Sequence, residues 1–196
     1  ATMTIQFPTI IQGGMGAAVS NYELARAVST HGGLGVVSGT GIDQILARRL
    51  QESGVQDDML RALKVFPCQE TAAEIINKYY VEGGKGPEAR YKTPAMYTID
   101  PSKSLERLTV AAGFVEVWLA KEGHNKPVGM NLLEKIPLPN MATLYGAMLA
   151  GVDYVLMGAG IPWQIPGILD GLAENKPVSM QLALEDDPDR VGATMT

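Results

Sequence analysis

Short apolar runs alternate along the chain with longer segments in which apolar residues recur every three or four positions. The short runs predict buried strands, and the periodic segments predict helices that bury one face. We expect strands at residues 9–12, 34–38, 128–133, 154–157 and 178–184. Because helical segments separate these strands, the pattern predicts an α/β fold with a parallel sheet.

The first predicted helix follows the strand at 9–12. Ser20 and Asn21 are good N-cap residues, and Leu24, Ala27 and Val28 then recur at helical spacing. We therefore expect Leu24, Ala27 and Val28 to form an apolar face of this helix.

The pattern changes between residues 42 and 104. Helices are expected at 42–50, 59–66 and 71–80, and a glycine- and proline-containing loop follows at 82–94. This is more chain than a simple crossover needs, so we interpret 42–104 as an inserted lid or subdomain within one domain that spans 1–196.

Three of the predicted strands end in glycine-bearing segments or small residues. A doubly wound sheet tends to concentrate such residues at one switch point, whereas a barrel brings every loop of one rim to a central ligand. The pattern therefore favours a TIM (β/α)8-type barrel. A complete barrel takes about 250 residues, so we expect only about the first five strands here and interpret the chain as part of a longer protein.

Composition narrows the class of protein. Hydrophobic residues make up 46% of the chain, charged residues 19%, and the formal net charge is −5. These values are typical of a folded domain and indicate neither a nucleic-acid partner nor a membrane partner. Cys68 is the single cysteine and no signal peptide is recognisable, so we expect a cytoplasmic protein.

The candidate binding site consists of the residues that close three strands. Glycine there lets a flat ligand lie against the backbone, and an asparagine amide offers both a donor and an acceptor. The simpler interpretations are tight turns, an asparagine that satisfies local backbone groups, and close helix–strand packing. The residues are Gly13, Gly14, Met15 and Gly16, then Asn131, then Gly158, Ala159 and Gly160.

Four further residues at strand ends are candidate substrate contacts. Ser38 and Gly39 close the second strand, and Glu134 and Lys135 follow the third. The alternative for Glu134 and Lys135 is a solvated loop pair.

The histidines and tryptophans are interpreted as structural. His31 and His124 both lie where helices stop, and neither has a nearby cluster of cysteine, histidine or carboxylate residues, so no metal site is expected. Trp118 and Trp163 are expected to pack in the core.

Several of these segments resemble one known family. The run Phe-Pro-Thr-Ile-Ile-Gln-Gly-Gly-Met-Gly at 7–16, together with 19–21, 24–25 and 32–39, resembles the opening of the nitronate monooxygenase family, also called 2-nitropropane dioxygenase-like proteins. Residues 127–131 and 158–162 are similar to later strand segments of that family, which includes FMN-dependent enoyl-acyl-carrier-protein reductases.

The resemblance implies an FMN-binding TIM barrel. In it, the backbone of 13–16 lines the isoalloxazine ring, Asn131 hydrogen-bonds the flavin, and 158–160 pass beneath or beside it. The catalytic histidine of the family lies in a Gly-Gly-His segment on a later strand that this sequence lacks, so the catalytic residue is unknown. The phosphate-binding glycines also belong to later strands, so the chain carries the ring-facing half of the site.

The resemblance implies an oxidoreductase that oxidises alkyl nitronates with O2. An FMN-dependent enoyl-acyl-carrier-protein reductase that uses NAD(P)H is the alternative within the same fold. A third hypothesis is a non-catalytic half-barrel that pairs with a second copy or with the missing half of the barrel.

Overall fold

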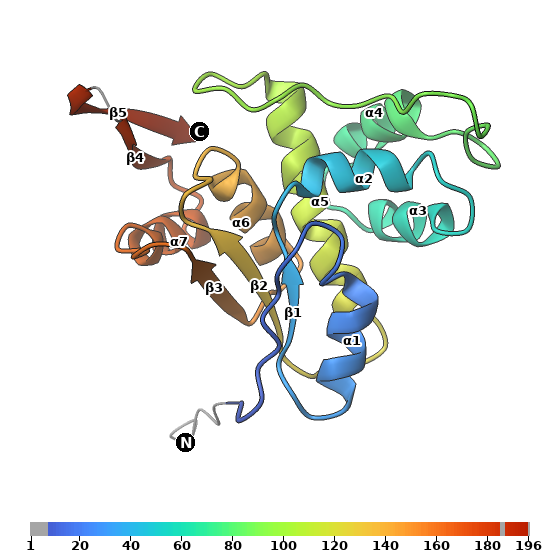
Figure 1. Cartoon of the computed structure of the whole chain (residues 1–196), viewed down its shortest axis with the longest axis horizontal. Coiled ribbons are helices and arrows are strands. Elements are labelled where there is room, and N and C mark those ends of the chain that lie inside the picture. The colour runs from blue at the N-terminus through green and yellow to red at the C-terminus, as the bar shows by residue number, and fades with distance from the viewer. Residues whose placement is uncertain (1–7, 185–186, 196) are drawn as a thin grey trace.

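The computed structural model describes residues 8–184 and 187–195, with side chains described as far as residue 182. This part of the chain forms seven α-helices, one three-stranded parallel sheet and one two-stranded antiparallel sheet (Figure 1). The predicted α/β class is confirmed. The parallel sheet is open, so no closed barrel is present among the described residues.

The parallel sheet follows chain order. It consists of β1 (Gly35–Ser38), β2 (Val128–Leu133) and β3 (Tyr154–Gly158), and Ser38 lies opposite Asn131 in the register. Helix α5 (Lys103–Lys121) precedes β2 and α6 (Asn140–Leu149) precedes β3. The carboxyl ends of the three strands therefore meet at one edge.

The predicted first strand at 9–12 is wrong as a regular strand, because it forms a single parallel bridge between Ile11 and Leu34. The Gln12 N–H donates to Leu34 O at 3.0 Å, but the Gln12 side-chain oxygen then takes the Val36 N–H at 3.1 Å. The Val36 N–H, which would form the next backbone hydrogen bond of a strand pair, thus donates to the Gln12 side chain instead. Ile10 is 69% exposed, so burial does not hold this segment in a strand either.

Helix α1 (Tyr22–Thr30) begins where the sequence predicts, with Asn21 Oδ1 accepting from Leu24 N at 3.0 Å. The predicted apolar face is not the face that is buried: Leu24 is exposed, and the buried residues are Tyr22, Ala25 and Ser29. The polar atoms of this face have partners, since Ser29 Oγ donates to Pro127 O at 2.7 Å. Hydrogen-bonded polar groups can be buried at little cost, so a polar face was able to pack inward.

The insertion forms three helices, as predicted. They are α2 (Ile42–Arg49), α3 (Gln56–Lys64) and α4 (Gln69–Tyr79), gathered on α5 at the side of the molecule away from β3 (Figure 1). Apolar residues of these helices and of the sheet belong to one continuous core. At its centre, Arg49 and Glu116 form a buried ion pair of 2.6 Å.

Helices α5 and α6 pack with their backbones in contact. A Cβ added at Gly113 would lie 2.5 Å from Thr143 O, and one at Gly146 would overlap Val110 O. Glycine at both positions is what allows this approach. In the described part of the chain, no helix combines the length and the apolar character needed to cross a membrane.

The predicted fifth strand exists as β4 (Val178–Leu184), but it is not part of the parallel sheet. It pairs antiparallel with β5 (Asp187–Met195), and this hairpin follows α7 (Ile165–Ala173). On the other side of β4, the Gln164 amide donates to Gln181 O at 3.1 Å and accepts from Gln181 N at 2.8 Å. The backbone groups of β4 thus find partners without β3, which corrects the prediction of a fifth parallel strand.

Candidate functional site

The segments predicted to share a site meet at the carboxyl edge of the parallel sheet. Asn131 lies at the meeting point, where its side-chain nitrogen donates to Gly13 O at 2.6 Å and contacts Met15 Sδ at 3.3 Å. Its backbone oxygen accepts from Gly39 N at 2.8 Å. Residues separated by more than 90 positions in the sequence are therefore brought into direct contact.

Asn131 also has an unpartnered group. The residue is only 8% exposed, and its Oδ1 atom is buried without a hydrogen-bond partner. A Cβ at Gly158 would lie 3.9 Å from this oxygen, so Oδ1 faces the end of β3. Because the amide nitrogen is already occupied, the free function of Asn131 is that of an acceptor and not the mixed donor and acceptor that the sequence suggested. A buried acceptor without a partner is costly, and a ligand that carries an N–H would satisfy it.

The glycines after residue 12 have two different roles. Gly14 and Gly16 have φ values of 66° and 82°, which favour glycine, and a Cβ at Gly14 would overlap the Val36 side chain. These two positions form the tight turn of the simpler interpretation. At Gly13 and Gly158, by contrast, an added Cβ would meet protein atoms only at ordinary contact distance, 3.8 Å and 3.5 Å respectively. A side chain would therefore be tolerated at Gly13 and Gly158, and the glycines at these positions leave a side-chain-poor surface beside Asn131.

The loop after β3 is held in an unusual conformation. Ala159 has a φ of 65°, which is strained for a residue with a side chain. A Cβ at Gly160 would overlap the Glu134 carboxylate, and Glu134 N donates to Gly158 O at 2.9 Å. The segments after β2 and β3 are therefore fitted closely to each other.

Ser38 and Gly39 have structural partners. Ser38 is buried, its N–H donates to Ser20 O at 2.9 Å, and its Oγ accepts from Thr40 N at 3.3 Å. A Cβ at Gly39 would overlap Leu132. Both residues hold the loop after β1 against β2.

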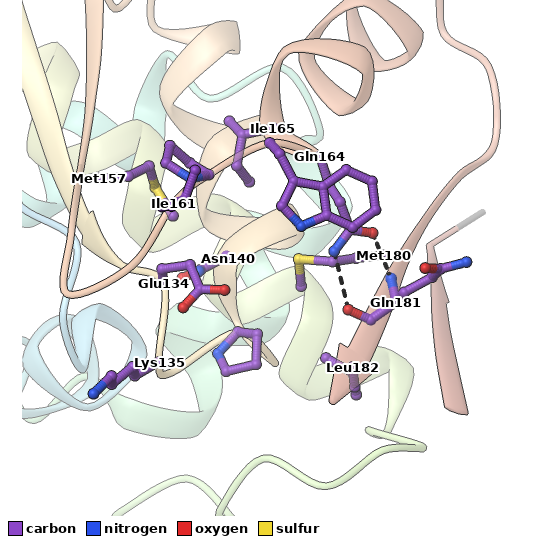
Figure 2. Close-up of a pocket in the computed structure, with 13 residues that line it drawn as sticks. Glu134, Lys135, Asn140, Met157, Ile161, Gln164, Ile165, Met180, Gln181 and Leu182 are labelled. Carbon is purple, nitrogen blue, oxygen red and sulfur yellow. Dashed lines mark hydrogen bonds between the residues drawn. The ribbon is translucent and has the colours of Figure 1, made fainter. Parts of the chain in front are cut away.

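A cavity of about 430 Å³ lies beside this edge, where the ends of β2 and β3 face α7 and β4 (Figure 2). Two of the predicted substrate residues, Glu134 and Lys135, line it, whereas the predicted cofactor glycines do not. Trp163 also lines it and is 65% exposed, so its assignment to the core is wrong. Its position in the loop directly after the end of β3 was the signal that the sequence offered. Trp118 does pack against the core.

The two histidines lie at the opposite, amino ends of the strands. His31 is the C-cap of α1, with Nδ1 2.7 Å from Ala27 O. His124 Nε2 lies 2.8 Å from Ala120 O, and its Nδ1 accepts from Lys126 N at 3.1 Å. Their local bonds give both histidines the structural roles that the sequence suggested.

The strongest electrostatic effects occur in and around the helical region. Burial raises the pKa of Glu116, although Arg49 opposes this effect. Burial also raises the pKa of Asp43 and raises the pKa of Tyr97 to about 12. Hydrogen bonds from Arg61 hold the pKa of Glu122 below its usual value.

The carboxyl edge of the sheet with the segments at 13–16 and 158–160, here called the glycine edge, thus offers a side-chain-poor surface and one buried acceptor. This arrangement is suited to a flat ring that carries an N–H. In the part of the chain that the structure describes, no group of three or more histidine, cysteine, aspartate and glutamate residues could hold a metal ion. Comparison of the chain with models of known families, with curated proteins and with solved structures finds no match.

Proposed function

We propose that this chain is the ring-binding part of an FMN-dependent oxidoreductase of the nitronate monooxygenase type. The observation that carries the proposal is the Asn131 Oδ1 atom, buried and unpartnered where the segments at 13–16 and 158–160 converge. A flavin ring is flat and carries an N–H group, so it matches both the side-chain-poor surface and the free acceptor.

The sheet order supports the barrel that this proposal requires. The segment around Ile11, then β1, β2 and β3, lie side by side in chain order, and all are parallel. A doubly wound sheet reverses its order at a switch point, whereas a barrel does not. In the proposed barrel, further strands would join both open edges and would carry the phosphate-binding glycines and the catalytic histidine.

The residues of this chain would hold and orient the ring. Asn131 Oδ1 would accept a ring N–H, while its amide nitrogen keeps the 13–16 loop in place through Gly13 O. The side-chain-free backbone at Gly13 and Gly158 would lie against the ring face. Bound FMN would supply the redox chemistry by which an alkyl nitronate loses electrons and O2 takes them up. A cytoplasmic setting belongs to the same proposal, because Cys68 is a free and exposed thiol.

Flavin titration of the protein tests the proposal. Added FMN should change its absorbance spectrum, and Asn131→Ala should weaken binding about tenfold, the effect of losing one buried hydrogen bond. Asn125→Ala is the matched control, because this exposed asparagine lies before the amino end of the same strand, β2. An unchanged flavin spectrum at millimolar protein would contradict the proposal.

Turnover assays assign the substrate. O2 consumption with an alkyl nitronate, measured on the flavin-loaded protein supplemented with the proposed remaining strands, would support the monooxygenase assignment. NADPH oxidation with a crotonyl thioester in its place would assign the protein to the enoyl reductases instead.

One observation favours the assembly module as a second candidate. Ile10 and Ile11 are exposed along the edge of the sheet next to β1, and exposed apolar groups beside an open edge are typical of a surface that pairs. Light scattering tests this candidate. A stable monomer at micromolar concentration would exclude pairing with a second copy.

A further inference from the structure

The cavity beside the carboxyl edge of the sheet is bounded by apolar side chains and by polar groups to a similar extent. Its volume of about 430 Å³ falls in the range of small-molecule sites. Most of its wall comes from the loop after β3, from α7 and from β4. The apolar lining residues are Pro137, Met157, Ile161, Pro162, Trp163, Ile165, Met180 and Leu182.

The amide side chains at this cavity are already engaged. Asn140 Nδ2 donates to Leu133 O at 3.1 Å, and the Gln164 amide is bonded to the backbone of Gln181. The half-buried Glu134 carboxylate differs from them, because its oxygens have no hydrogen-bond or ion-pair partner among residues 8–182. Figure 2 shows the Lys135 side chain turned away from the other labelled residues, so it does not neutralise this carboxylate.

The Glu134 carboxylate lies close to the loop after β3. It lies against Gly160, where an added Cβ would overlap a carboxylate oxygen. The same loop carries Ile161 and Trp163, which are both largely exposed although they line the cavity. The cavity lining thus includes both a negative charge and an accessible indole ring.

We propose that this cavity binds a primary alkylammonium ligand. A half-buried carboxylate without a partner favours a cationic donor, because a charge-assisted hydrogen bond replaces the water that it loses. The indole face of Trp163 attracts a cation, and the apolar walls bury an alkyl chain. An anionic ligand of the same size would be repelled by Glu134. The inference does not depend on flavin binding, since the cofactor glycines do not line the cavity.

Three octyl ligands with different head groups test the proposal. Octylammonium, octanol and octanoate are titrated into the flavin-free protein at pH 7, with calorimetry and tryptophan emission as readouts. We expect octylammonium to bind about fivefold more tightly than octanol, the gain of a partly exposed ion pair, and octanoate to bind most weakly. Trp163→Phe should remove the emission change, because Trp118 packs against the core.

Two variants locate the charge. Glu134→Gln should bring octylammonium to the affinity of octanol, and Gly160→Ala should have the same effect by displacing the carboxylate. Glu174→Gln is the control, because it changes the net charge equally at the far end of α7. Equal binding of the three ligands, tighter binding of octanoate, or no binding by a protein with a native circular dichroism spectrum would each overturn the proposal. Failure of FMN to bind would leave this result unaffected.

Discussion

The buried charge of the helical region and the polar groups at the carboxyl edge of the sheet are satisfied in opposite ways, although Tyr97 OH and Thr143 Oγ1 near α5 also lack hydrogen-bond partners. Around α5, the buried Glu116 carboxylate accepts both from Arg49 at 2.6 Å and from Tyr22 N at 2.8 Å. At the edge of the sheet, Asn131 Oδ1 is buried without a partner and Glu134 lacks an ion pair among the described residues. A buried polar group without a partner calls for an explanation, and at the edge of the sheet the explanation that we propose is a ligand.

The difference between the two regions suggests that one determines the stability of the fold and the other determines ligand binding. The helical region should carry much of the folding free energy, and the edge should carry ligand affinity. Substitutions in the two regions should therefore change different measurements.

The largest expected effect follows from breaking the buried ion pair. Arg49→Met leaves Glu116 buried and uncompensated, so the free energy of unfolding should fall by about 3–5 kcal/mol in urea denaturation. Arg107→Met is the matched control, because its pair with Glu74 is half exposed and 3.7 Å long. A loss of stability as small as that of the control would show that the helical region does not depend on this pair.

A somewhat smaller effect is expected where α5 and α6 touch. Gly146→Ala places a methyl group against Val110 O, so the helices must separate, at a cost of about 2–3 kcal/mol. Gly167→Ala, in the open part of α7, should instead stabilise the protein by about 0.5 kcal/mol by restricting the unfolded chain. Thermal unfolding of the two variants measures the contrast, and equal effects would refute the close packing.

Glu122, at the end of α5, forms ion pairs with Arg26 of α1 and Arg61 of α3. The stability that these pairs contribute should depend on pH. Arg61 lowers the pKa of Glu122, so the carboxylate stabilises the fold above its unfolded pKa, and this stabilisation is lost as pH falls through the folded pKa. Glu122→Gln should lower the free energy of unfolding by about 1 kcal/mol at pH 7, a modest value because Arg61 is partly exposed. The difference between wild type and variant should shrink toward pH 3. A difference independent of pH would contradict this origin.

The smallest effect on stability is expected at the edge itself. Asn131→Ala removes the bond to Gly13 O, but it also removes the unpartnered oxygen, so the two changes partly cancel. The free energy of unfolding should change by no more than about 1 kcal/mol. A much larger loss would mean that Asn131 is a structural residue and that the contrast between the two regions fails.

Much of the fold could be predicted because its signals are local. The Asn21 cap, the glycine stops and the apolar runs of β1, β2 and β3 are properties of neighbouring residues. The pairing of the segment at 9–12 and of β4 was predicted wrongly, because strand pairing depends on residues that are far apart in the sequence. The Gln12 and Gln164 side chains took positions that other strands would have filled.

The candidate site was predictable in location but not in detail. Parallel strands bring their carboxyl ends together, so the contact between Gly13 and Asn131 followed from topology. Two details depend on side-chain packing and could not be predicted. One is that Oδ1 is the free atom of the Asn131 amide, and the other is that the Val36 side chain fills the space at Gly14. Trp163 was misassigned although its place in the loop after β3 indicated a position beside the strand ends.

Binding of riboflavin and FMN, compared on this chain, tests the central claim most directly. The chain is proposed to contact the flavin ring through Asn131, Gly13 and Gly158 and to lack the phosphate anchor, so the two ligands should bind with equal affinity. Asn131→Ala should weaken both to the same extent. No riboflavin binding by the folded protein, or a strong preference for FMN that survives Asn131→Ala, would contradict the account.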